Sequence, residues 1–198
     1  EDVDVILAPG INIKRVAGCG RNFEYFSEDP YLTGILAAQY VNGLENNNVG
    51  ACVKHYACNS QEHGRTVNSS DVSLRALNEI YLRGFKYTLK YSNPSSIMTS
   101  YNKVNGVYVN ESEYLLQKKL RQEFGFKGLI MSDWCAVSDK GKTFNTGLNI
   151  EMPLSRVLAD MEITGIRVDS NYLDEVACDL KKHMEIYHSI TLMFFQLI

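Results

Sequence analysis

The segment Gly128-Leu129-Ile130-Met131-Ser132-Asp133-Trp134 places three consecutive apolar residues before a carboxylate and the only tryptophan of the chain. A short apolar run of this kind is typical of a strand inside a molecule, and a carboxylate there is costly to bury. We therefore expect Asp133 to lie where the strand ends. A Ser-Asp pair after a strand also suits the N-cap of a following helix, so a purely structural role for Asp133 is the alternative.

The same pattern of a short apolar run followed by polar residues occurs elsewhere in the chain. Segments whose apolar residues recur at helical spacing separate these runs, which indicates a repeated βα unit. The predicted parallel strands lie near residues 3–8, 51–56, 96–100 and 128–132.

The helical segments also show their faces and ends. The first begins at Asp29-Pro30, an N-cap followed by a residue suited to the first turn, and Gly125 marks the end of the third. Apolar residues share one face of each helix: Leu32, Leu36, Tyr40 and Leu44 in the first, Leu74, Leu77, Tyr81, Phe85 and Leu89 in the second, and Leu116, Leu120 and Phe124 in the third.

Apolar strands alternating with helices favour a parallel sheet covered on its outside, either as an open sheet or as a closed (β/α)₈ barrel. The polar residues favour the barrel, because they follow the C-terminal ends of several strands, where a barrel builds its active site. No GxGxxG or GxxxxGK[ST] loop supports a nucleotide-binding open sheet. Four units, with residues 147–152 as a possible fifth strand and 171–187 as a last helix, are too few for eight strands. We predict an α/β fold that is part of a (β/α)₈ barrel.

Composition excludes some partners. The 198 residues carry 20 basic and 23 acidic side chains, a net charge of −3, which gives no electrostatic footprint for nucleic acid or an anionic membrane. The apolar run at 192–198 is too short to span a bilayer. The five cysteines are scattered without a CxxC pair and indicate free thiols, which leans towards a reducing, cytoplasmic compartment but leaves the localisation unknown.

Four motifs, in this order, resemble the N-terminal barrel domain of glycoside hydrolase family 3. They are Gly20-Arg21-Asn22-Phe23-Glu24-Tyr25-Phe26-Ser27-Glu28-Asp29-Pro30, Val53-Lys54-His55-Tyr56, Met98-Thr99-Ser100-Tyr101-Asn102 and Ile130-Met131-Ser132-Asp133-Trp134. The resemblance is strongest over residues 3–153, and 154–198 diverge from it. It implies that residues 1–198 are the C-terminal portion of an incomplete barrel domain, with a further α/β domain expected downstream.

The resemblance also assigns the chemistry of a retaining β-glycosidase. It makes Asp133 the catalytic nucleophile and Trp134 an apolar wall of the sugar subsite. Retaining hydrolysis needs a second carboxyl group about 5–5.5 Å away as acid/base. The resemblance places that group in the downstream domain, and the two carboxyl groups suffice without a metal or an organic cofactor.

The resemblance further implies residues that bind the sugar. Arg21, Lys54, His55 and Arg65 are expected to donate hydrogen bonds to its hydroxyl groups, and Met98 and Tyr101 to line the pocket. A surface charge or ion pair is the alternative for each cation, and an ordinary core methionine the alternative for Met98. Because neighbouring strand residues point to opposite faces, Lys54 and His55 both reach the pocket only if the strand end is irregular.

The expected substrate is a β-linked glucoside or a short oligosaccharide. A β-xylosidase is the alternative, although such relatives typically read Asp-Cys-Asp where this chain has Asp133-Trp134-Cys135. A truncated, non-catalytic remnant without the acid/base is the second alternative. The sequence therefore predicts that Lys54, His55, Arg65 and Asp133 converge in one concavity at the C-terminal rim of the strands.

Overall fold

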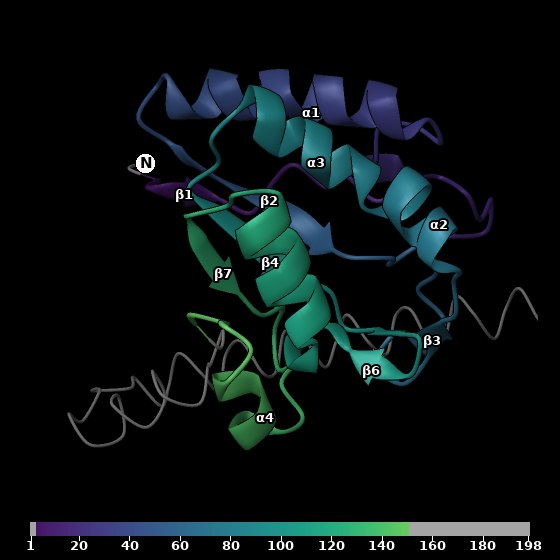
Figure 1. Cartoon of the computed structure of the whole chain (residues 1–198). Helices are drawn as coiled ribbons and strands as arrows, with labels where there is room; N and C mark the ends of the chain where they lie inside the picture. The colour runs from purple at the N-terminus through teal and green to yellow at the C-terminus, as the bar shows by residue number, and fades with distance from the viewer. Residues whose placement is uncertain (1–2, 151–198) are drawn as a thin grey trace, which may run out of the picture. The chain divides into compact units, whose positions relative to one another are not determined.

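The computed structural model describes residues 3–150. Its main sheet contains four parallel strands, which confirms the predicted strands and their direction (Figure 1). They are β1 (Val5–Ile6), β2 (Gly50–Tyr56), β4 (Ser96–Thr99) and β7 (Leu129–Met131). Their spatial order, β1-β2-β4-β7, follows the chain order, as consecutive strands of a (β/α)₈ barrel do.

The predicted fifth strand is present only as its beginning. Ile150 forms a parallel bridge with Met131, and the backbone N–H of Ser132 donates to the Ile150 carbonyl at 3.0 Å. Residues 151 and 152, the predicted last helix at 171–187 and the divergent end of the chain lie outside the described residues.

The helices begin and end close to the predicted residues. The Asp29 carboxylate accepts hydrogen bonds from the N–H groups of Tyr31 and Leu32, which confirms the N-cap, and Gly125 follows Phe124 with a φ of +71°. The helical elements are η1 (Asn22–Glu24), α1 (Pro30–Glu45), α2 (Leu74–Ala76), η2 (Leu77–Tyr81), α3 (Arg83–Tyr91), η3 (Val109–Glu111), η4 (Tyr114–Glu123) and α4 (Lys140–Phe144).

The apolar face predicted for α1 is not the face that packs. Leu32, Leu36 and Tyr40 are exposed, whereas the buried residues of α1 are small, among them Gly34 and Ala37. Figure 1 shows α1 and α3 side by side over the sheet. A Cβ on Gly34 would lie 2.5 Å from the Cβ of Tyr87 in α3, so this close approach requires glycine. Small residues fill the contact because the helix backbones are close, a constraint that apolar spacing alone does not reveal.

Two clusters of buried apolar residues lie against the sheet. The larger cluster contains Val53, Ile97 and Ile130 together with residues of the covering helices. The smaller contains Cys52, Met98 and Met131. Because successive residues of a strand point to opposite faces, the second cluster belongs to the face turned towards the interior of the barrel. The predicted site lies at the C-terminal ends of the same strands.

A second, small sheet was not predicted from the sequence. It joins β3 (Ser69–Ser70) in parallel to β5 (Lys103–Val104), which pairs antiparallel with β6 (Val107–Tyr108). Asn105 and Gly106, with φ of +50° and +84°, form the tight turn of this hairpin. The sheet ties the loop after β2 to the loop after β4, and these loops carry Arg65 and Tyr101.

Candidate active site

Asp133 lies directly beyond β7, at the C-terminal rim, as predicted. It is 7% exposed, and its Oδ1 accepts a hydrogen bond from the Trp134 backbone N–H at 2.8 Å. Its Oδ2 is buried and accepts no hydrogen bond from the described residues. The nearest basic group is His55, whose Nε2 lies 3.7 Å from Oδ2. One oxygen of the carboxylate is therefore fixed by the backbone, and the other has no hydrogen-bond donor among the described residues.

The end of β2 has the irregularity that its two polar residues require. The pairing of β2 with β4 shifts register between Val53 and Tyr56. The segment after β1 holds this end in place: the Ile11 N–H donates to the Lys54 carbonyl at 2.6 Å. Asn12 donates to the His55 carbonyl and accepts from the His55 N–H, each at 2.9 Å.

His55 is buried as a neutral imidazole. Burial, together with the positive charges of Arg21, Lys54 and Arg65, lowers its pKa to about 2. All three predicted cationic residues therefore act electrostatically on one ring, and that ring faces Asp133. The four side chains therefore interact with one another, while their gathering in a single concavity and their roles towards a sugar remain predictions.

The low pKa of His55 predicts how stability depends on pH. Between pH 6.5 and about 2 the unfolded chain binds a proton at this imidazole that the folded chain does not, so stability falls as the pH is lowered below 6.5. We expect the thermal midpoint of His55→Gln to fall less between pH 6.5 and 4 than that of the wild type. His63→Gln, at an exposed histidine, is the control and should keep the wild-type slope. Equal slopes for His55→Gln and the wild type would contradict a buried neutral His55.

Lys54 and Arg21 share one carboxylate. The Nζ of Lys54 lies 3.3 Å from Oε2 of Glu24, and the Nε of Arg21 hydrogen-bonds to Oε1 of the same residue. The Lys54 side chain is only 15% exposed. Lys54 is thus turned away from bulk solvent, and Glu24, the last residue of η1, braces the two cations in fixed positions.

Arg65 reaches the rim from the loop after β2. Its guanidinium lies 4.6 Å from the ring centre of Tyr101 and donates to Glu62 at 2.6 Å. Burial, together with the charge of Asp133, raises the pKa of Tyr101 to about 12. The phenol therefore keeps its proton beside the carboxylate.

Met98 and Trp134 differ in their surroundings. Met98 is buried in the cluster with Cys52 and Met131, as expected for the alternative of an ordinary core methionine. Its contact with a substrate remains a prediction. The Trp134 side chain is 47% exposed, and its backbone N–H fixes Asp133.

A small hollow of about 90 Å³ is lined by Thr66, Tyr101, Tyr108, Cys135, Ala136, Val137 and Ser138.

Several residues that shape the site were not predicted from the sequence. Tyr25 contacts His55, and Glu62 holds Arg65 and Asn59. Asn110 shares a hydrogen bond with Thr99 and donates to the Ala136 carbonyl at 3.1 Å, which ties the loop after Asp133 to β4. These asparagine, glutamate and tyrosine residues carry no local pattern, because their partners are distant in sequence.

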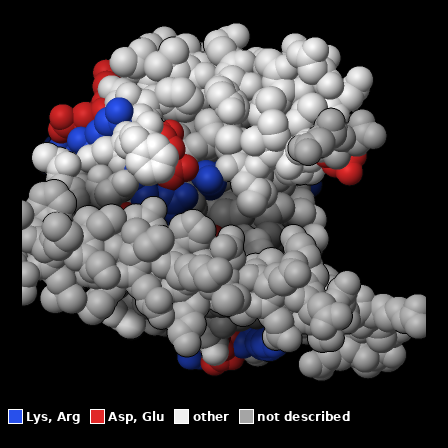
Figure 2. Space-filling view, turned by 180° about the vertical axis from the view of Figure 1, so that it is seen from behind, with Lys and Arg blue, Asp and Glu red and all other residues white. Residues whose placement is uncertain are grey.

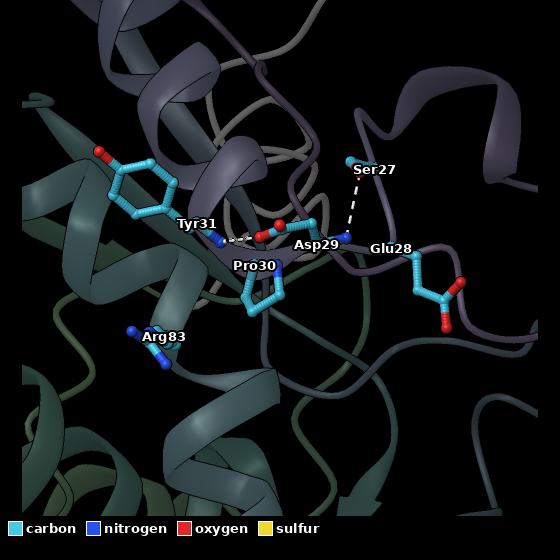
Figure 3. A pocket seen from close by; sticks show the side chains of 6 residues that line it. All are labelled: Ser27, Glu28, Asp29, Pro30, Tyr31 and Arg83. Atoms are coloured by element: carbon cyan, nitrogen blue, oxygen red, sulfur yellow. Dashed lines mark hydrogen bonds between the residues drawn. The ribbon is translucent and has the colours of Figure 1, made fainter.

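The described part of the chain also has a larger hollow. A hollow of about 660 Å³ is lined by Ser27, Glu28, Asp29, Pro30, Tyr31 and Arg83, none of which is a predicted site residue (Figure 3). There the Asp29 carboxylate turns to the Tyr31 N–H as a helix cap. Figure 2 shows positive and negative side chains interspersed on one face, without a basic patch among the described residues visible there.

Three further findings concern residues 3–150. No helix in this range has the length and apolar character needed to cross a membrane. No cluster of histidine, cysteine, aspartate or glutamate in the same part of the chain is placed to hold a metal ion. Four of the predicted free thiols are confirmed: Cys19, Cys52, Cys58 and Cys135.

The fold and the rim together define part of a (β/α)₈ barrel whose C-terminal edge holds a buried carboxylate close to a histidine. The chain belongs to the family described as the glycosyl hydrolase family 3 N-terminal domain, whose model matches residues 1–174.

Named relatives and solved structures are similar to most of this chain. Thermostable β-glucosidase B of Acetivibrio thermocellus is 47% identical over 163 residues, which are 82% of this chain and 22% of the relative. Exo-α-(1→6)-L-arabinopyranosidase of Bifidobacterium longum is 49% identical over 78% of this chain and 20% of the relative. The structure of β-glucosidase 3B from Thermotoga neapolitana with α-D-glucose superposes with a TM-score of 0.76 at 44% identity, covering 92% of this chain and 25% of that one. This chain thus spans about a fifth of the length of the curated relatives it matches.

Proposed function

We propose that the complete protein, meaning the product of the natural reading frame that contains residues 1–198, is a retaining exo-β-glucosidase. The observation that carries this proposal is the Asp133 carboxylate, held by one oxygen and unbonded among the described residues at the other. A retaining mechanism needs such an oxygen to attack the anomeric carbon and form a glycosyl ester.

The surrounding donors suit a neutral polyol. Arg21, Lys54 and Arg65 are cations at fixed positions, and hydrogen bonds from charged donors are roughly twice as strong as neutral ones. His55 adds a neutral donor or acceptor next to the nucleophile. With Tyr101, these groups form the part of the first sugar subsite that this chain supplies.

We propose that the acid/base lies outside residues 1–198, in the downstream domain. The two carboxylates that belong to the described cluster are already engaged: Glu24 holds Arg21 and Lys54, and Glu62 holds Arg65. A proton donor for the leaving oxygen must be free to exchange its proton, and neither of these carboxylates is placed to do so. The partner of this chain is then the missing domain of its own protein.

The sugar is tested by assay of the complete protein. We expect kcat/KM to be highest for an aryl β-glucoside, lower for the β-xyloside, and the first-formed sugar to keep the β configuration by NMR. The α-L-arabinopyranoside is included because two relatives at 49% identity bear that name. Release of the α-sugar from the β-glucoside or β-xyloside would contradict retention, and no hydrolysis of any of the three would favour the non-catalytic remnant.

A further inference from the structure

Tyr25 lies against His55 and has no part in the chemistry described so far. Its side chain is buried, and its hydroxyl lies 3.3 Å from the Nδ1 of His55. The two rings meet edge to face with centroids 6.3 Å apart. A Cβ on Gly10 would lie 3.0 Å from two carbons of the tyrosine ring, so glycine there makes room for this contact.

The protons of this contact are fixed by the groups at its two ends. At one end, the Nδ2 of Asn59 donates to the Tyr25 oxygen at 3.5 Å, which leaves the phenol its own proton to donate. At the other end, the Nε2 of His55 faces the Asp133 carboxylate at 3.7 Å. A lone pair on Nε2 would be repelled by the carboxylate, whereas an N–H is attracted to it. The phenol therefore donates to Nδ1, and the imidazole proton sits on Nε2.

The charge of His55 is already decided by its other neighbours. Arg21, Lys54 and Arg65 disfavour a second proton on the ring, and Asp133 is the only acidic residue in direct contact with it among the described ones. Burial also raises the pKa of Tyr25, so its hydroxyl remains a donor. Only the choice between two neutral tautomers is left, and Asp133 at Nε2 and Tyr25 at Nδ1 make that choice together.

We propose that Tyr25 is a positioning residue that holds His55 in the Nε2–H tautomer, so that this N–H is directed at the Asp133 carboxylate and at a hydroxyl of the bound sugar. The effect on turnover rests on the function proposed above. The proposed tautomer does not rest on that function, because the contacts of Asn59 with Tyr25, of Tyr25 with His55 and of His55 with Asp133 are present without a substrate.

The tautomer is tested first, on the complete protein labelled with ¹⁵N-histidine. The His55 ring nitrogens are assigned by their loss in His55→Gln. We expect a protonated Nε2 and an unprotonated Nδ1 in the wild type, and a mixture of the two neutral forms in Tyr25→Phe. Unchanged ring shifts in Tyr25→Phe would overturn the proposal, whether or not the protein hydrolyses glucosides.

A double-mutant cycle then tests the effect on turnover. Tyr25→Phe should lower kcat/KM for an aryl β-glucoside about tenfold, the size of one lost hydrogen bond. In the His55→Gln background the same change should cost less than about twofold, because a glutamine amide donates without needing Tyr25. Equal losses in the two backgrounds would show that Tyr25 acts through packing alone, and the proposal would be wrong.

Tyr56→Phe is the matched control. This change also removes one buried phenol hydroxyl. In the wild type the Tyr56 hydroxyl donates to the Leu115 carbonyl at 3.0 Å, on the helix-covered face of β2, the strand that also carries His55. The thermal midpoint of Tyr56→Phe should fall by about as much as that of Tyr25→Phe, while its kcat/KM and its His55 shifts stay as in the wild type. A loss of turnover in Tyr56→Phe equal to that in Tyr25→Phe would count against a specific role for Tyr25.

Discussion

Asp133→Asn in the complete protein is expected to lower kcat/KM for aryl β-glucosides on the order of 10⁵-fold, in the range that loss of other covalent nucleophiles costs. The reason is chemical rather than structural. An amide keeps the size of the side chain and accepts the Trp134 N–H through its oxygen, but it does not attack an anomeric carbon. We therefore expect the thermal midpoint to change by only a few degrees.

Two measurements check this result. Steady-state kinetics give the loss, and mass spectrometry after treatment with a slowly hydrolysed 2-fluoro-β-glucoside should find the label on the peptide that contains Asp133. Asp139→Asn is the matched control. Asp139 caps α4, where asparagine is an equally good cap, so activity should stay near wild type. Label on another carboxylate would falsify the assignment of Asp133.

The sequence predicted the strands of this fold because their signal is local. Runs such as Leu129-Ile130-Met131 are apolar at every position, as a strand covered on both faces requires, and Asp29-Pro30 is a cap that depends only on its neighbours. The hairpin at Asn105-Gly106 has an equally local turn signal, but its strands have only two residues each, too short for their periodicity to be detected.

The packing of α1 shows what local patterns miss. Leu32, Leu36 and Tyr40 suggest a buried stripe, yet the buried face is set by how closely α3 approaches Gly34. The residues of the site also fall into those that local patterns place and those that they do not. The positions of Asp133 and Lys54 follow from strand ends, whereas the contacts of Tyr25 with His55 and of Asn110 with Thr99 join residues from different βα units. Such pairs become visible only when the fold brings the loops together.

The proposed division of chemistry between this chain and a downstream domain leads to the second large effect. Residues 1–198 alone, once shown by circular dichroism and cooperative melting to be folded, should turn over 4-nitrophenyl β-glucoside at least about 10²–10⁴-fold more slowly than the complete protein, the usual contribution of an acid/base. With 2,4-dinitrophenyl β-glucoside the leaving group scarcely needs a proton, so the ester at Asp133 should still form and should accumulate.

The accumulated glycosyl ester can be detected by its reaction with azide. Azide attacks without losing a proton, so it should accelerate turnover of the dinitrophenyl substrate by the chain alone and yield β-glucosyl azide, while it should leave the complete protein nearly unaffected. The Asp133→Asn chain is the control and should show neither label nor azide effect, because no ester forms. Steady turnover by the chain alone at the rate of the complete protein would place the acid/base within residues 1–198. In that case Glu24 and Glu62, the carboxylates of the described cluster, would be the first to replace with glutamine.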